Sequence, residues 1–126
     1  MTERFDQGMK VRRQVLGNAH VDRASAQATV FDAPFQSLIT EAAWGTVWAS
    51  DALTRRERSL VTLALLAGLG NDEEFALHVR ATANTGATPD EVREALMHVA
   101  LYAGVPRANH ALKIAKATYA QMGIDP

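Results

Sequence analysis

The sequence contains no cysteine among its 126 residues, so disulfide bonds, thiolate metal sites and thiol redox chemistry are all excluded. It also lacks a run of Lys and Arg, and its formal net charge of -1 provides no basic surface for nucleic acid. No apolar run approaches the roughly 20 residues of a membrane-spanning helix. The charged N-terminal stretch does not match a signal peptide. These absences predict a cytoplasmic protein that binds neither nucleic acid nor membrane.

The four histidines do not occur at the spacings of a catalytic metal site. They stand at positions 20, 78, 98 and 110, with no His-x-x-x-His and no His-Glu-x-x-His. A glycine-rich phosphate loop and a nucleophile elbow are also missing from the sequence. We therefore expect no metal and no cofactor, which leaves acid–base chemistry by side chains.

The pattern of apolar residues predicts an all-α fold. Apolar residues make up 48% and charged residues 21% of the chain, which is typical of one globular domain spanning residues 1–126. Sustained alternation and hairpin turn signals are missing, so strands are not expected. About six helices are predicted, with residues 17–24 as a polar connection; the expected ranges are 2–16, 33–48, 55–67, 72–85, 89–103 and 106–122.

Two of these helices begin with the sequence of a capping box. Thr54 and Thr88 are each followed three residues later by a glutamate. The helix after Thr54, SLVTLALLAGLG, is apolar nearly all the way round, which predicts burial on most of its sides. Alanine is frequent on several of the helical stripes, which favours close packing and a homo-oligomer.

Glu74 and His78 form the candidate catalytic pair. Their spacing of four places both on one flank of a helix, where a carboxylate and an imidazole can share a proton or orient each other. The small residues Ala81 and Thr85 follow on the same flank and leave room for a ligand. The alternative interpretation is a purely structural pair in a dry helix crossing.

Other side chains could complete a site. Arg58 stands at the start of the apolar helix, either as a solvated or structurally paired charge or as a fixed cation for an anionic ligand. Arg80 falls on nearly the opposite side of its helix from His78, so it could serve only a site in a partner subunit. Trp44 and Trp48 stand four apart, which fits the core, a subunit interface or the wall of a pocket.

The segments VRRQVLGNAHVDRA, AWGTVW and EEFALHVRATANTGATPDEVREALMHVALYAGVPRANHAL resemble the 4-carboxymuconolactone decarboxylase family. The resemblance extends over essentially the whole chain and implies an AhpD-like all-α fold in a ring-like homo-oligomer, a hexamer or a trimer, with sites near subunit contacts. Thiol enzymes of the wider superfamily carry Cys-x-x-Cys-x-x-x-His. Matching that histidine to His78 puts Asn71 and Glu74 at the two cysteine positions, which excludes peroxidase activity.

The resemblance implies a cofactor-independent decarboxylation of 4-carboxymuconolactone to 3-oxoadipate enol-lactone, in the protocatechuate branch of the β-ketoadipate pathway. His78 would protonate the dienolate or donate to its oxygen, and Glu74 would orient His78 or carry the proton itself. The dicarboxylate lactone would be held by a second group of residues: Arg58, Arg80, Trp44, Trp48 and His20. A same-fold enzyme acting on a related lactone or oxo acid stays open, as does a non-catalytic oligomeric binding protein.

Overall fold

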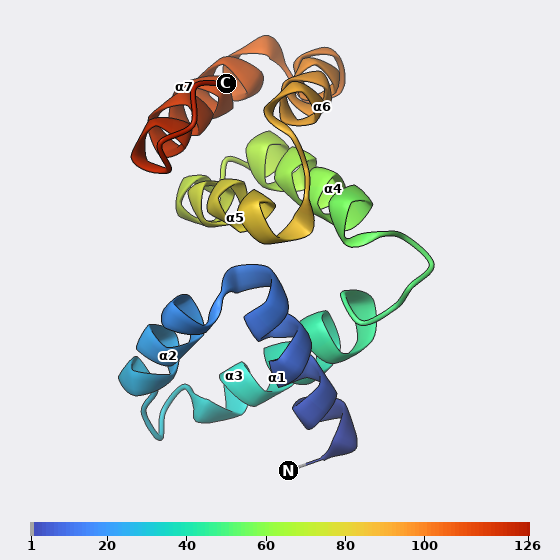
Figure 1. Cartoon of the computed structure of the whole chain (residues 1–126), viewed down its shortest axis with the longest axis vertical. Helices are drawn as coiled ribbons and strands as arrows, with labels where there is room; N and C mark the ends of the chain where they lie inside the picture. Colours follow the sequence, from blue (N-terminus) through green and yellow to red (C-terminus); the bar gives the residue numbers. More distant parts are fainter. Residues whose placement is uncertain (1) are drawn as a thin grey trace. The chain divides into compact units, whose positions relative to one another are not determined.

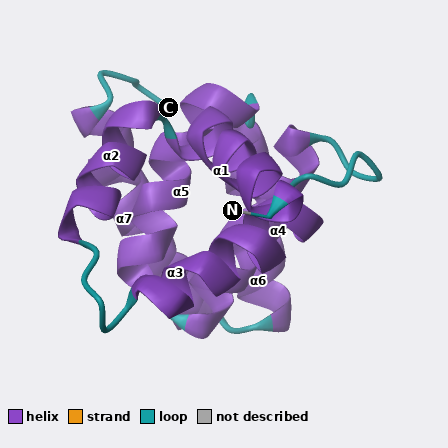
Figure 2. Ribbon diagram, turned by 90° about the horizontal axis from the view of Figure 1, so that it is seen from below, coloured by secondary structure: helices purple, strands orange, loops and turns teal. Residues whose placement is uncertain are grey.

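The structure is a computed structural model that describes residues 2–126, and every regular element among them is a helix (Figures 1 and 2). The predicted all-α class is confirmed. The elements are α1 (Glu3–Leu16), α2 (Asn18–Gln27), α3 (Ala33–Ile39), the π-helical segment η1 (Thr40–Val47), α4 (Arg55–Leu69), α5 (Asp72–Thr85), α6 (Pro89–Tyr102) and α7 (Val105–Gln121). None of these helices is both long and apolar enough to cross a bilayer.

The chain divides into two compact units, an N-terminal unit that ends at Thr54 and a C-terminal unit that begins at Arg55. In the N-terminal unit, α1 packs along η1.

Helices α1 and η1 approach so closely that only glycine fits at two positions of their contact. A Cβ on Gly8 would lie 2.1 Å from the carbonyl oxygen of Thr40, and one on Gly45 would lie 2.4 Å from that of Arg4.

The prediction of a connection over residues 17–24 was wrong, because α2 occupies this segment. Gly17, at φ 90°, ends α1 and immediately precedes the new helix, without a side-chain cap. Tertiary contacts compensate for the missing start signal. Val21 is fully buried, and the Asp22 carboxylate accepts a hydrogen bond of 2.8 Å from Arg13.

The helix predicted over residues 33–48 begins where expected, but its second half is π-helical. Asp32 is the N-cap residue, with Pro34 in the first turn. In η1 the N–H of Trp48 donates to the carbonyl of Ala43 at 2.8 Å, a bond between residues five apart. The predicted apolar stripe is not buried along its length, because three of its members are exposed: Phe35 and Leu38 in α3 and Val47 in η1.

The C-terminal unit is a four-helix arrangement in which α4 packs on α5 and α6, and α7 packs on the same three helices as a group. Its core contains large apolar residues from every helix: Leu63, Phe75, Val79, Val92, Leu96 and Tyr119. The predicted inward face of α5 is confirmed, since Phe75, Val79 and Thr82 are buried. On the predicted stripe of α6, Val92, Leu96 and Val99 are buried, whereas Ala103 is exposed beyond the end of the helix.

The prediction that α4 is buried on most sides was wrong, because the rest of the chain covers only one side of this helix. Its buried residues are Ser59, Leu63 and Ala67 alone. Val61, Leu65 and Leu69 are 52%, 60% and 67% exposed. These three residues stand four apart, so they form one apolar stripe along the outside of the helix. Helix α4 therefore has two apolar faces: one is buried by the rest of the chain, and the other is exposed.

The capping box at the start of α6 is confirmed in full. The Thr88 hydroxyl accepts from the N–H of Glu91 at 3.2 Å, and the Glu91 carboxylate accepts from the N–H of Thr88 at 3.0 Å. The other carboxylate oxygen of Glu91 binds Arg56 of α4. The backbone N–H of Thr88, with Arg56 contributing, lowers the pKa of Glu91. One carboxylate therefore caps α6 and links it to α4.

We expect a Glu91→Gln variant to lose stability at neutral pH but not in acid. Glutamine keeps a capping acceptor and removes only the charge. Because the native pKa lies below the unfolded value of about 4.3, the charge stabilises the native state above that pH. This contribution disappears as the pH falls through the native pKa. Thermal unfolding by circular dichroism from pH 7 to 3 should therefore show a Tm difference that shrinks below about pH 4.

The matched control is Glu94→Gln, one turn away on the exposed side of α6. Its carboxylate is only 3.5 Å from Arg93 Nε and has no capping role. An equal, equally pH-dependent Tm loss in this variant would contradict the specific role of Glu91.

Candidate functional site

His78 lies on the second turn of α5, and the ends of this helix explain its position. Asn71 is the N-cap residue, and Gly86 ends the helix in the left-handed conformation with its N–H bonded to the carbonyl of Thr82. The helix buries the face that carries His78, whose side chain is 9% exposed. An imidazole held there is shielded from bulk water yet stays on a rigid element.

Glu74 and His78 occupy successive turns of α5, as their spacing predicts, but their environments differ. Glu74 is exposed in the first turn, whereas His78 is buried. Ala81 and Thr85, which follow on the same flank, are also buried. The imidazole is therefore the shielded member of the pair, and the carboxylate is the member that meets solvent.

The two arginines assigned from the sequence lie on different helices of the C-terminal unit. Arg58 is half-buried in the first turn of α4, directly before the fully buried Ser59. Since α4 packs against α5, Arg58 is on a helix adjacent to the one that carries His78. Arg80 lies on the exposed side of α5, away from its buried face.

The remaining three assigned residues belong to the N-terminal unit. Trp44 of η1 and Trp48, directly after η1, are both buried, and their ring centroids are 5.2 Å apart with the planes tilted by 30°. This arrangement fits a favourable aromatic pair. His20 is half-buried on α2, a helix rather than the expected connection.

The structure also reveals a pair of a histidine and an aspartate that the sequence did not predict. His110 Nε2 of α7 lies 2.9 Å from Asp72 Oδ2 at the start of α5, and both side chains are more than half exposed. His98 stacks on Tyr102 with ring centroids 5.3 Å apart. The contact of His98 with Tyr102 was predicted from their spacing of four. The contact of His110 with Asp72 joins residues 38 apart and depends on the packing of α5 against α7.

Within residues 2–126, no three His, Asp or Glu side chains come close enough together to hold a metal ion. The chemistry available from the described side chains is therefore that of a shielded imidazole, exposed carboxylates and arginines. This set can transfer a proton and bind anions.

Comparisons with known proteins extend over both units. The sequence pattern of the Carboxymuconolactone decarboxylase family matches residues 33–117. A 4-carboxymuconolactone decarboxylase of Acinetobacter baylyi is 43% identical over 124 residues, covering 98% of this chain and 92% of that protein. A nitrosuccinic acid decarboxylase of Metarhizium robertsii is 46% identical over 118 residues, covering 94% and 82%. A 4-carboxymuconolactone decarboxylase of Pseudomonas putida is 51% identical over 43 residues, covering 34% and 90%.

Proposed function

Because the chain belongs to the carboxymuconolactone decarboxylase family, we propose that it decarboxylates 4-carboxymuconolactone to 3-oxoadipate enol-lactone without a cofactor. The observation that carries this proposal is the similarity to the Acinetobacter baylyi 4-carboxymuconolactone decarboxylase, which extends over nearly the full length of both chains. The shielded imidazole of His78 supplies a group suited to the proton transfer that the reaction needs.

The substrate itself explains why a cofactor is unnecessary. Its departing carboxylate sits on the ring carbon γ to the lactone carbonyl and is joined to that carbonyl through a C=C bond. When the C–C bond to the carboxylate breaks, CO₂ leaves and the electron pair delocalises to the lactone oxygen as a dienolate. The enzyme has to stabilise this developing charge, exclude water and return one proton to carbon.

In this mechanism His78 gives the proton to the dienolate, or hydrogen-bonds its oxygen while carbon is protonated. Burial on α5 keeps the imidazole out of bulk water. Electrostatic interactions are stronger in the protein interior than in water, because the local dielectric constant is lower. Glu74, exposed one turn earlier, orients His78 when substrate or a neighbouring subunit covers it, or exchanges the proton with solvent. Reprotonation from water completes the cycle.

The substrate carries two carboxylates, so the site needs cations as well as an acid. Arg58 is the first candidate, because a planar guanidinium binds a carboxylate in bidentate fashion and α4 is adjacent to α5. Arg80, on the exposed side of α5, would serve the site of a neighbouring subunit. The resemblance in sequence also implies substrate contacts in the N-terminal unit, with Trp44 and Trp48 as apolar contacts and His20 as a polar one.

Nitrosuccinic acid is the second candidate substrate, because the Metarhizium robertsii relative is named for its decarboxylation and is 46% identical. The two substrates share their chemistry. In nitrosuccinate a carboxylate sits on the carbon that bears the nitro group, so loss of CO₂ leaves a nitronate whose charge rests on oxygen. Both are dianions that contain their own electron sink, and both need a proton returned to carbon.

Assaying the purified protein with each substrate tests this proposal. CO₂ release and product mass are followed at matched concentrations. We expect kcat/KM for 4-carboxymuconolactone to exceed that for nitrosuccinate at least tenfold, and the opposite order would establish the second candidate. Stoichiometric binding of both compounds without turnover would contradict decarboxylation and favour a binding protein.

We further propose that a second copy of this chain covers the exposed stripe of α4, formed by Val61, Leu65 and Leu69. An apolar stripe of this kind is typical of a subunit contact, and α6 adds exposed apolar residues, Met97 and Leu101, within the same unit. A Leu65→Glu variant should therefore shift the protein toward monomer, as measured by sedimentation velocity. The control is Ala117→Glu, which adds the same charge on the exposed side of α7. A wild-type protein that sediments as a monomer would refute the proposal.

A further inference from the structure

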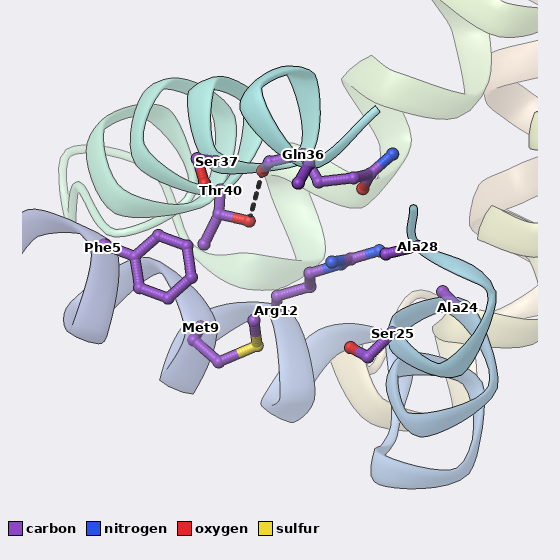
Figure 3. A pocket seen from close by; sticks show the side chains of 10 residues that line it. Phe5, Met9, Arg12, Ala24, Ser25, Ala28, Gln36, Ser37 and Thr40 are labelled. Carbon is purple, nitrogen blue, oxygen red and sulfur yellow. Dashed lines mark hydrogen bonds between the residues drawn. The ribbon is translucent and has the colours of Figure 1, made fainter. Parts of the chain in front are cut away.

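The N-terminal unit contains a cavity of about 170 Å³ whose lining includes none of the residues assigned to the reaction (Figure 3). Residues of α1, α2, α3 and η1 line it, together with Ala28 directly after α2. Its walls are largely apolar, with Phe5 and Met9 on one side and Ala24 and Ala28 on another. A compact organic group would find complementary surface there.

Arg12 is the one ionisable residue in this lining. In Figure 3 its side chain extends across the cavity toward Ala28, below the amide of Gln36. The Nε atom is buried and has no hydrogen-bond partner among residues 2–126. The ion pairs found in the same residues do not include Arg12, whereas its neighbour Arg13 binds Asp22 at 2.8 Å.

Burial, with a smaller contribution from the adjacent charge of Arg13, lowers the pKa of Arg12. Arginine nevertheless stays protonated at any physiological pH. A half-buried cation without an anionic partner lowers the stability of the protein that carries it. An anionic ligand in the cavity would offset this cost.

The polar groups of the lining narrow the class of ligand. Ser25, Gln36 and Ser37 are neutral, and the Thr40 hydroxyl already donates to the carbonyl of Gln36 at 2.7 Å. One guanidinium in an otherwise neutral and apolar cavity matches a single negative charge on an apolar body. The planar fork of arginine binds a carboxylate through two parallel hydrogen bonds.

We propose that this cavity is a binding site for a small organic carboxylate, with Arg12 pairing with the carboxylate and the apolar body lying against Phe5 and Met9. The proposal does not rest on the decarboxylation proposed above, because none of the residues assigned to that reaction lines the cavity. The terminal nitrogens of the guanidinium make the pairing, since Nε is covered by protein.

Isothermal titration with benzoate tests the site, with benzamide as the neutral probe of the same shape and inorganic phosphate as a small anion. We expect benzoate to bind at one per chain, and benzamide and phosphate each to bind at least tenfold more weakly. Arg12→Gln should weaken benzoate by about 10- to 100-fold, the range expected for hydrogen bonds to a charged group. Equal affinity for benzoate and benzamide would overturn the proposal.

Three variants show whether benzoate occupies this cavity or binds at another place on the protein. Lys10→Gln removes a positive charge from the exposed side of the same helix and should leave benzoate binding unchanged. Ala28→Leu fills the cavity while Arg12 stays intact, so it should weaken benzoate even if Arg12→Gln fails to fold. His78→Ala should bind benzoate normally. Binding lost in His78→Ala but kept in Arg12→Gln or Ala28→Leu would place the ligand elsewhere and refute the proposal.

Discussion

Replacing His78 by alanine is expected to lower kcat for decarboxylation by about 10²- to 10⁴-fold, the usual contribution of a positioned general acid. The imidazole is 9% exposed on α5, so solvent has little access to replace it as a proton donor. Steady-state CO₂ release measures the effect. The sedimentation coefficient and the helical circular dichroism should be retained, because the large side chains that α5 adds to the core are Phe75 and Val79.

Two further variants test whether the loss of kcat is specific to His78 and whether Glu74 contributes to it. His98→Ala removes an exposed histidine that stacks on Tyr102, and it should keep wild-type kcat. Glu74→Gln should lower kcat less than His78→Ala if the carboxylate only orients the imidazole, and as much if it carries the proton. Wild-type kcat in both His78→Ala and Glu74→Gln would refute the assignment of this pair.

Replacing Gly8 by alanine is expected to have the largest effect on stability. The new methyl carbon would lie 2.1 Å from the carbonyl oxygen of Thr40 and 2.9 Å from the N of Gly45. Both atoms belong to the backbone of η1, so no side-chain rotation can relieve the clash and the two helices have to move apart. Overpacking typically costs about 1–3 kcal/mol, and we expect a loss at or above the upper end. Urea unfolding followed by circular dichroism measures it.

Gly68→Ala provides a matched control with the opposite expected sign. Gly68 lies in the last turn of α4, and a Cβ there would meet the Ala103 Cβ at 3.4 Å, an ordinary contact distance. Alanine is about 0.5–1 kcal/mol more favourable than glycine in a helix interior, so we expect a smaller gain of the same sign in this last turn. Equal destabilisation by the two substitutions would mean that close approach of α1 and η1 is not what requires Gly8.

Local signals in the sequence were sufficient to place the boundary between α5 and α6. The capping box of Thr88 and Glu91 and the left-handed turn at Gly86 place α5 and α6 within a residue or two of their actual bounds. Helix α2 was missed because it begins after Gly17 with no side-chain cap and is held by the burial of Val21. Such a helix depends on tertiary contacts that a local pattern does not contain.

The site divides in the same way between local and tertiary information. Helical spacing correctly put Glu74 and His78 on successive turns, but it could not show that one is exposed and the other buried. The pair of Asp72 and His110 joins two helices, and the burial of Arg12 Nε without a partner among residues 2–126 depends on what surrounds it in three dimensions. Neither feature has a signature in the order of residues.

The π-helical segment η1 makes this part of the chain tolerant of a change of length that a regular helix would not tolerate. A π-helical turn contains one residue more than an α-helical turn, and each α-helical residue advances by about 100° around the axis. Deleting one residue from a regular helix such as α4 would therefore rotate everything after it by that angle. Deleting one residue between Thr40 and Val47 would instead convert a π-helical turn into an α-helical turn, and the residues after it would keep their direction. The extra residue in η1 is thus a reserve of length within the helix.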